Sequence, residues 1–156
     1  MKTFKVLIVE DDENKKDRIY EFYKSKFEDD EVFWESALVS GLRSAKEINP
    51  DFIILDMTLP NYEAGVQAGF NPMRPFGGRE FLRQAVRLRL KSKIIVMTQF
   101  ETFGAAPNLV DLASLDAELH DLFPNQYIGS IYYHASMSSW QSKLFNARKD
   151  CMEPKK

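Results

Sequence analysis

The chain has 156 residues, a length that suits one domain with a sizeable core. Its hydrophobic content of 44% excludes a disordered chain, and its formal net charge of -2 gives no overall attraction to DNA or anionic lipid. One cysteine, Cys151, cannot form an internal disulfide, and one cysteine with two histidines argues against a structural zinc site. Because there is no signal peptide and no long apolar run, we expect a cytoplasmic protein.

The first half of the chain predicts three strands and two helices. The apolar run at 6–9 predicts a buried strand over residues 4–9. Residues 14–27 carry apolar side chains on one helical stripe and should form a helix. A short strand is expected at 32–35, a helix at 38–48 and a strand at 52–55. Asn and Pro directly after the second helix end it, because the residue before a proline avoids helical geometry.

The second half continues the alternation. A helix is expected at about 79–91, with several arginines on its outer face, and a strand at 94–97. A further helix lies within 108–123, and an aromatic-rich strand follows at 127–133. The last helix should begin near Ser139, because Ser138 and Gln141, three residues apart, can make a capping box.

Strands that alternate with helices predict an α/β fold, here a five-stranded parallel sheet with helices on both faces. The pattern contains no linker and no internal repeat, so we expect a single domain over residues 1–156. Its core should span about 4–148, and residues 149–156 should form a frayed tail.

Three of the apolar runs end on polar side chains. The first run leads into Glu10, Asp11 and Asp12, the third into Asp56, and the fourth into Thr98. Ligand sites in parallel sheets lie just past the carboxyl ends of the strands, so these residues should meet at one edge. Several carboxylates at one edge repel each other unless a cation joins them, and a hard divalent ion such as Mg²⁺ suits oxygen ligands.

These strand ends carry three motifs in chain order: VLIVEDD, IILDMTLP and IIVMTQF. Together they resemble the receiver domain of two-component response regulators, whose fold is flavodoxin-like. The resemblance implies that a histidine kinase phosphorylates Asp56, and that Thr98 contacts the phosphoryl group. It also implies that Glu10, Asp11 and Asp56 hold Mg²⁺ together with the backbone carbonyl of Thr58. The implied partners are a histidine kinase or phosphotransfer protein and a downstream protein target, without direct nucleic-acid or membrane binding.

The chain departs from the family in three places. The family carries a lysine at the end of the last strand that pairs with the phosphoryl group, and here His134 or Tyr133 stands there, depending on the register. Either side chain gives a hydrogen bond without a permanent charge. Gln99 stands where the family prefers a small side chain. The loops after the third and fourth strands are enlarged, and Pro60 and Gly78, which frame the first of them, are 18 positions apart.

Two hypotheses follow. The first is a phosphoacceptor switch, active at most in self-phosphorylation and dephosphorylation on Asp56. Without a DNA-binding output domain after the last helix, we expect it to act as a stand-alone regulator or as the receiver piece of a larger protein. The alternative is a pseudo-receiver, a protein-interaction module that no longer depends on phosphorylation, and the absent lysine and Gln99 favour it. A phosphohydrolase with Asp56 as nucleophile is discounted, because such a motif needs a second aspartate where Thr58 stands.

Overall fold

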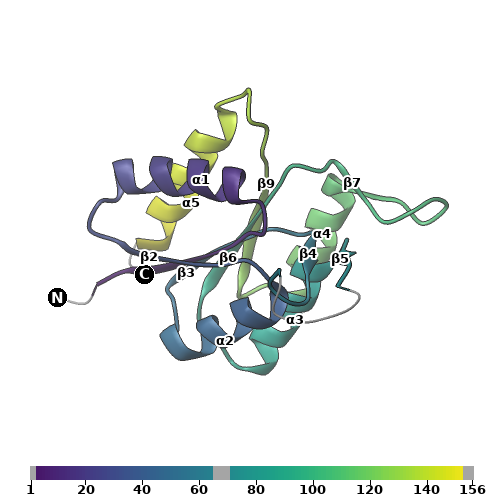
Figure 1. Ribbon diagram of the computed structural model, residues 1–156, viewed down its shortest axis with the longest axis horizontal. Coiled ribbons are helices and arrows are strands. Elements are labelled where there is room, and N and C mark those ends of the chain that lie inside the picture. The colour runs from purple at the N-terminus through teal and green to yellow at the C-terminus, as the bar shows by residue number, and fades with distance from the viewer. Residues whose placement is uncertain (1–2, 65–70, 153–156) are drawn as a thin grey trace.

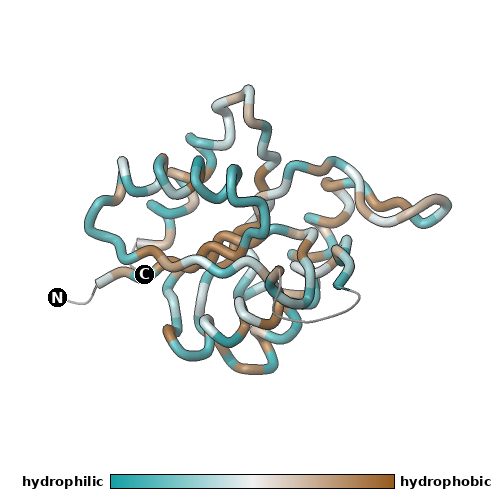
Figure 2. The backbone as a smooth tube through the Cα atoms, viewed as in Figure 1, coloured by the Kyte–Doolittle hydropathy of each residue, from teal (hydrophilic) through white to brown (hydrophobic). Residues whose placement is uncertain are grey.

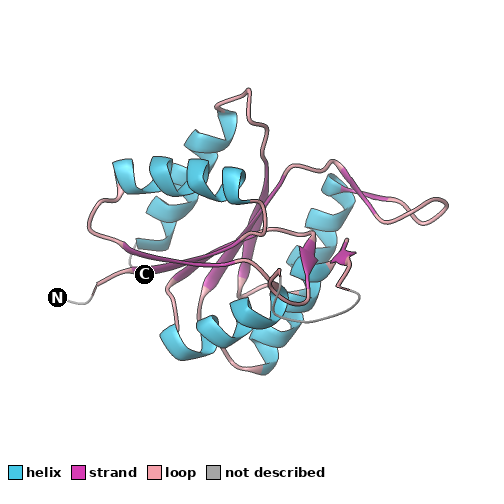
Figure 3. Cartoon of the chain, viewed as in Figure 1, coloured by secondary structure: helices cyan, strands magenta, loops and turns pink. Residues whose placement is uncertain are grey.

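The computed structural model describes residues 3–64 and 71–152. Five parallel strands form the central sheet in the order β2-β1-β3-β6-β9 (Figures 1 and 3). Their bounds are β1 (Lys5–Val9), β2 (Glu31–Glu35), β3 (Phe52–Leu55), β6 (Lys93–Thr98) and β9 (Tyr127–Tyr132). The helices are α1 (Glu13–Lys26), α2 (Leu38–Ile48), α3 (Gly77–Arg87), α4 (Leu112–Leu122) and α5 (Ser139–Met152). This architecture confirms the expected five-stranded parallel sheet with helices on both faces.

Alternate side chains of the strands enter two separate apolar cores. On one face, Leu7, Ile53 and Val96 pack with side chains from α2, α3 and α4. On the other face, Ile8 and Ile54 pack with side chains from α1 and α5. Because both faces are covered, the central strands are apolar over most of their length, and Figure 2 shows them as the most hydrophobic part of the chain.

Parallel pairing aligns the carboxyl ends of the central strands. Val9 of β1 lies beside Leu55 of β3, which in turn lies beside Val96 of β6. Thr98, the last residue of β6, lies beside Tyr132 of β9. The residues after each of these strands therefore emerge at one edge of the sheet.

Helix α3 has different bounds from those expected, whereas α4 lies within its expected range of 108–123. Helix α3 ends at Arg87 rather than near residue 91, because Arg89 adopts a left-handed conformation with φ of 58°. Helix α4 begins at Leu112, where the side chain of Asp111 caps it by accepting a hydrogen bond from the backbone of Ser114.

Each enlarged loop contains a small antiparallel pair of strands that the sequence pattern did not indicate. In the first loop, β4 (Leu59–Pro60) pairs with β5 (Met73–Arg74), and in the second, β7 (Thr102–Phe103) pairs with β8 (Val110–Asp111). The second pair projects away from the body of the molecule (Figure 3). Strands of two residues are too short to show a period in the sequence, which is why they were missed.

Helix α5 continues through residues 149–152, which the sequence analysis assigned to a frayed tail; residues 153–156 lie outside the described residues. Arg148 anchors this end of the helix, because its buried guanidinium bonds Asp30 and the hydroxyl of Tyr23. Among the described residues, no helix is long and apolar enough to cross a membrane.

Candidate functional site

Backbone hydrogen bonds fix two acids just past the strand ends. The amide of Glu10 donates to Glu35 O at 3.0 Å, and the amide of Asp56 donates to Val9 O at 2.9 Å. Both carboxylates are buried, at 2% and 5% exposure, whereas Asp11 is half-buried. Glu10, Asp11 and Asp56 each offer a carboxylate oxygen, and these oxygens lie within 4.8 Å of one another. The sheet therefore brings the three predicted acids together.

A buried lysine that the sequence analysis did not identify lies among these acids. Lys15 Nζ lies 2.6 Å from Glu10 Oε1 and 3.4 Å from Asp56 Oδ1, and it donates a hydrogen bond to Met97 O at 2.8 Å. Its side chain is only 2% exposed. A buried ammonium needs partners of this kind, because an unpaired charge away from water costs several kcal/mol.

The start of α1 positions this lysine. Asp12 caps the helix by accepting a hydrogen bond from the backbone of Lys15 at 3.2 Å. Lys15, Ile19 and Tyr23 then form the buried stripe of the helix, at intervals of four residues. The spacing of Lys15 from Ile19 was a weak signal in the sequence, because a lysine in a helix is usually exposed to solvent.

Burial and mutual repulsion set the protonation of the acids. Burial raises the pKa of Glu10 well above its ordinary value, and the Asp56 carboxylate adds to the rise, although Lys15 opposes it. Burial, followed by the charge of Asp56, raises the pKa of Asp11 to about 6. Burial alone would lower the pKa of Lys15, but the charges of Asp56 and Glu10 outweigh burial and raise it. Lys15 is therefore a fixed positive charge at neutral pH.

The donor set suits a hard cation. Three carboxylate oxygens from Glu10, Asp11 and Asp56 are the type of ligand that Mg²⁺ prefers. After burial, the charge of Asp56 is the next cause that raises the pKa of Asp11, and the opposing charge of Lys15 has a smaller effect. Thr58 lies two residues beyond Asp56, and its hydroxyl donates to Pro75 O at 3.4 Å, so its side chain is directed at the enlarged loop.

Thr98 and its neighbour differ in their environment. Thr98 is fully buried at the end of β6, and its hydroxyl oxygen accepts a hydrogen bond from the amide of Phe100 at 3.1 Å. Gln99 is exposed. The carbonyl of Thr98 accepts a hydrogen bond from the amide of Tyr133 at 2.7 Å, which joins β6 to the residue after β9.

The two candidates for the family's lysine position point in different directions. His134 is exposed, and its ring nitrogen Nδ1 lies 2.7 Å from the hydroxyl of Ser136. Tyr133 is buried, with its ring 5.2 Å from that of Trp140 and 5.7 Å from Lys15 Nζ. The residue that contacts Glu10 and Asp56 is therefore Lys15 from α1, and Tyr133 packs beside it.

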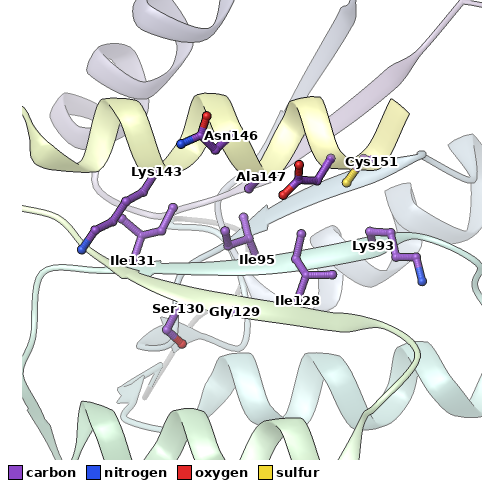
Figure 4. Close-up of a pocket in the computed structure, with 11 residues that line it drawn as sticks. Lys93, Ile95, Ile128, Gly129, Ser130, Ile131, Lys143, Asn146, Ala147 and Cys151 are labelled. Carbon is purple, nitrogen blue, oxygen red and sulfur yellow. The ribbon is translucent and has the colours of Figure 1, made fainter. Parts of the chain in front are cut away.

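Two cavities lie at different parts of the sheet. A cavity of about 260 Å³ has Asp11 in its wall, together with Pro60, Tyr62 and Met73 of the enlarged loop. This places the loop after β3 at the entrance to the acids. A second cavity, of about 510 Å³, lies between α5 and the edge strand β9, where Ile95, Ile128 and Lys143 are among the residues that line it (Figure 4).

No protein-family profile matches the chain. The chain is 46% identical over 145 residues to Uncharacterized protein y4jR of Sinorhizobium fredii, a match covering 92% of this chain and 96% of that protein. It is 30% identical over 144 residues to the Detocs response regulatory protein DtcB of Vibrio alginolyticus, covering 88% of this chain and 95% of that protein.

Solved structures share the fold. The response regulator domain of Thermotoga maritima CheB has a TM-score of 0.67 at 17% identity, over 99% of this chain and 100% of that chain. The response regulator protein TrrA of Thermotoga maritima, solved in complex with Mg²⁺ and BeF, has a TM-score of 0.60 at 16% identity, over 96% of this chain and 100% of that chain. Neighbours of this fold thus include a structure that contains magnesium.

Proposed function

Because this chain belongs to the response-regulator receiver family, we propose that Asp56 accepts a phosphoryl group from a histidine kinase or phosphotransfer protein in a magnesium-dependent phosphorelay. One observation carries this proposal. Asp56 follows the central strand β3 directly, and its carboxylate lies within 4.8 Å of those of Glu10 and Asp11. An acid held at the carboxyl edge of a parallel sheet, among other oxygen ligands, is placed to act as a nucleophile toward phosphorus.

Each residue of the site has a separate task in this reaction. The hydrogen bond from the amide of Met57 to Asp56 Oδ1, at 2.8 Å, fixes the orientation of the carboxylate. Glu10, Asp11, Asp56 and the Thr58 carbonyl would hold Mg²⁺. When bound, the ion neutralises the charges that carboxylate and phosphoryl oxygens bring together. The hydroxyl of Thr98, at the end of β6, would donate a hydrogen bond to the phosphoryl group.

We further propose that this regulator acts on a downstream protein target and not through a DNA-binding output domain. The curated relatives support this, since the matched region covers 95 to 96% of their own length. Those relatives therefore hold little sequence beyond the matched region.

One observation favours the pseudo-receiver as the alternative. Lys15 already supplies a cation to Glu10 and Asp56, so these two acids are compensated within the protein itself. In a pseudo-receiver, this ion pair would serve stability alone.

Intact-mass spectrometry after incubation with acetyl phosphate separates the two functions. A phosphoacceptor gains the mass of one phosphoryl group in the presence of Mg²⁺, and Asp56→Asn abolishes the gain. Asp121→Asn, which changes an exposed acid on α4, should label as the wild type does. A wild-type protein that stays unmodified with Mg²⁺ would establish the pseudo-receiver instead.

A further inference from the structure

We propose that Lys15 supplies the phosphoryl-pairing ammonium of this receiver from the first helix, in place of a lysine at the end of the last strand. The inference rests on the proposed phosphorylation of Asp56. Lys15 Nζ contacts Asp56 Oδ1 at 3.4 Å and Glu10 Oε1 at 2.6 Å. The ammonium therefore already touches the carboxylate that would carry the phosphoryl group.

The end of β9 explains why the cation comes from α1. Tyr133 occupies the position after β9, and its buried ring fills the space beside Trp140. Lys15 Nζ lies 5.7 Å from the centre of the Tyr133 ring, so the lysine from α1 and the residue after β9 converge on one place. The phenol of Tyr133 therefore occupies the space after β9, and Lys15 provides the positive charge.

Two arginines from the enlarged loop and α3 have other partners. Arg79 pairs with Glu118 of α4 at 2.8 Å, and Arg74 donates to the side chain of Asn61 at 3.1 Å. Lys143 is exposed on α5, where it lines the cavity beside β9 (Figure 4). In the described part of the chain, Lys15 is the cation that forms ion pairs with both Glu10 and Asp56.

Lys15 changes no covalent bond in the reaction. With acetyl phosphate, an oxygen of Asp56 forms a bond to phosphorus, and the bond between phosphorus and the acetate oxygen breaks, with its electron pair leaving on acetate. The product is an acyl phosphate on Asp56 with more negative charge than the carboxylate had. Lys15 is held by Met97 O at 2.8 Å, so it stays in place to pair with this added charge.

Three variants test the role of Lys15 with acetyl phosphate and Mg²⁺. Lys15→Met keeps the apolar stem and removes the charge, and the rate of labelling should fall about tenfold or more. Lys16→Met is the matched control, because Lys16 lies on the same turn but faces Asp17 and the ring of Trp34, and its labelling should equal that of the wild type. The double variant Lys15→Met/Tyr133→Lys returns the ammonium to the end of β9 and should recover most of the lost rate.

A second measurement uses the wild type and does not depend on turnover. With ¹⁵N-labelled lysine, the ammonium signal of Lys15, assigned through Lys15→Arg, should shift when beryllium fluoride is added to the Mg²⁺-loaded protein. This signal decides the question even if Lys15→Met does not fold.

The results separate the two proposals. Labelling of folded Lys15→Met at the wild-type rate, or an ammonium signal that beryllium fluoride leaves unchanged, overturns the role of Lys15 while phosphorylation of Asp56 stands. A wild-type protein that neither labels nor binds beryllium fluoride overturns the proposed function, and the inference about Lys15 falls with it.

Discussion

Trp34 Nε1 donates a hydrogen bond to the backbone carbonyl of Glu10 at 2.8 Å. This bond couples the indole of β2 directly to the first acid of the site. Trp34 is also 39% exposed, and Lys16 Nζ lies 4.1 Å from the centre of its ring. An indole in this position should respond to changes in charge at the acids.

Trp34 should report the binding of Mg²⁺. We expect its fluorescence to change as Mg²⁺ is added, and Asp11→Asn, which removes one oxygen ligand, to weaken the titration strongly. Trp34→Phe is the control, because the remaining Trp140 is buried against Phe22 and Tyr133 and has no hydrogen bond to Glu10 among the described residues. A wild-type titration curve from Asp11→Asn would argue against the site.

Asp11→Asn should stabilise the protein without Mg²⁺ at pH 7. Burial and the charge of Asp56 raise the pKa of Asp11 to about 6, so its ionised form is unfavourable in the folded state. Because Asp11 is half-buried and solvent screens its charge, we expect a gain of about 1 kcal/mol in the free energy of unfolding. Urea unfolding measures this gain, and saturating Mg²⁺ should reduce or reverse it, since the ion stabilises only the wild type. A loss of stability in the variant would mean that the Asp11 carboxylate is favourably paired.

The same pKa predicts how the gain depends on pH. The folded pKa of Asp11 is about 6, above the unfolded value of about 3.9, so the folded state binds the proton more tightly. The contribution of Asp11 to stability is therefore present below about pH 4 and is lost as pH rises to about 6. The difference in the free energy of unfolding between Asp11→Asn and the wild type should be near zero at pH 4, grow up to about pH 6 and then level off. A difference that is constant from pH 4 to pH 7 would contradict this assignment.

The ion pair of Arg148 and Asp30 should stabilise the contact between α1 and α5. Arg148 Nε lies 2.6 Å from Asp30 Oδ2, and the hydroxyl of Tyr23 bonds both residues. Arg148→Met leaves a buried carboxylate unpaired, and we expect a loss of about 3–5 kcal/mol. The double variant Arg148→Met/Asp30→Asn should recover part of the loss, and Lys149→Met, on an exposed neighbour, should change little. Equal stability of Arg148→Met and the wild type in urea would show that the pair contributes nothing.

Gly78 should be necessary for the position of Asp56. A Cβ at this residue would lie 2.6 Å from the carbonyl oxygen of Asp56 and 2.9 Å from the Cα of Met57, closer than atoms can approach. Gly78→Ala should therefore displace the backbone at Asp56, lower the melting temperature and slow labelling by acetyl phosphate. Arg87→Ala, at the exposed end of α3, serves as control. Unchanged labelling in a stable Gly78→Ala would show that α3 does not constrain the site.

The sequence alone was sufficient to predict the bounds of an element where the apolar pattern was clear and turn-forming residues marked its ends. Helix α2 and strand β3 have the expected bounds, because apolar runs are interrupted there by Asn49 and Pro50. The two short strand pairs in the enlarged loops could not be predicted, since each strand has two residues and its pairing depends on contacts across the loop.

The sequence by itself determined that Glu10, Asp11 and Asp56 would meet and that Thr98 would end a strand at the same edge, because parallel strands share one carboxyl edge. Only the tertiary structure decided which cation they meet. Strand register reveals nothing about the rotation of α1, which depends on the cap at Asp12 and on the packing of its buried stripe against the sheet. That rotation places Lys15 between Glu10 and Asp56, and a lysine in a helix otherwise reads as a solvent-exposed residue.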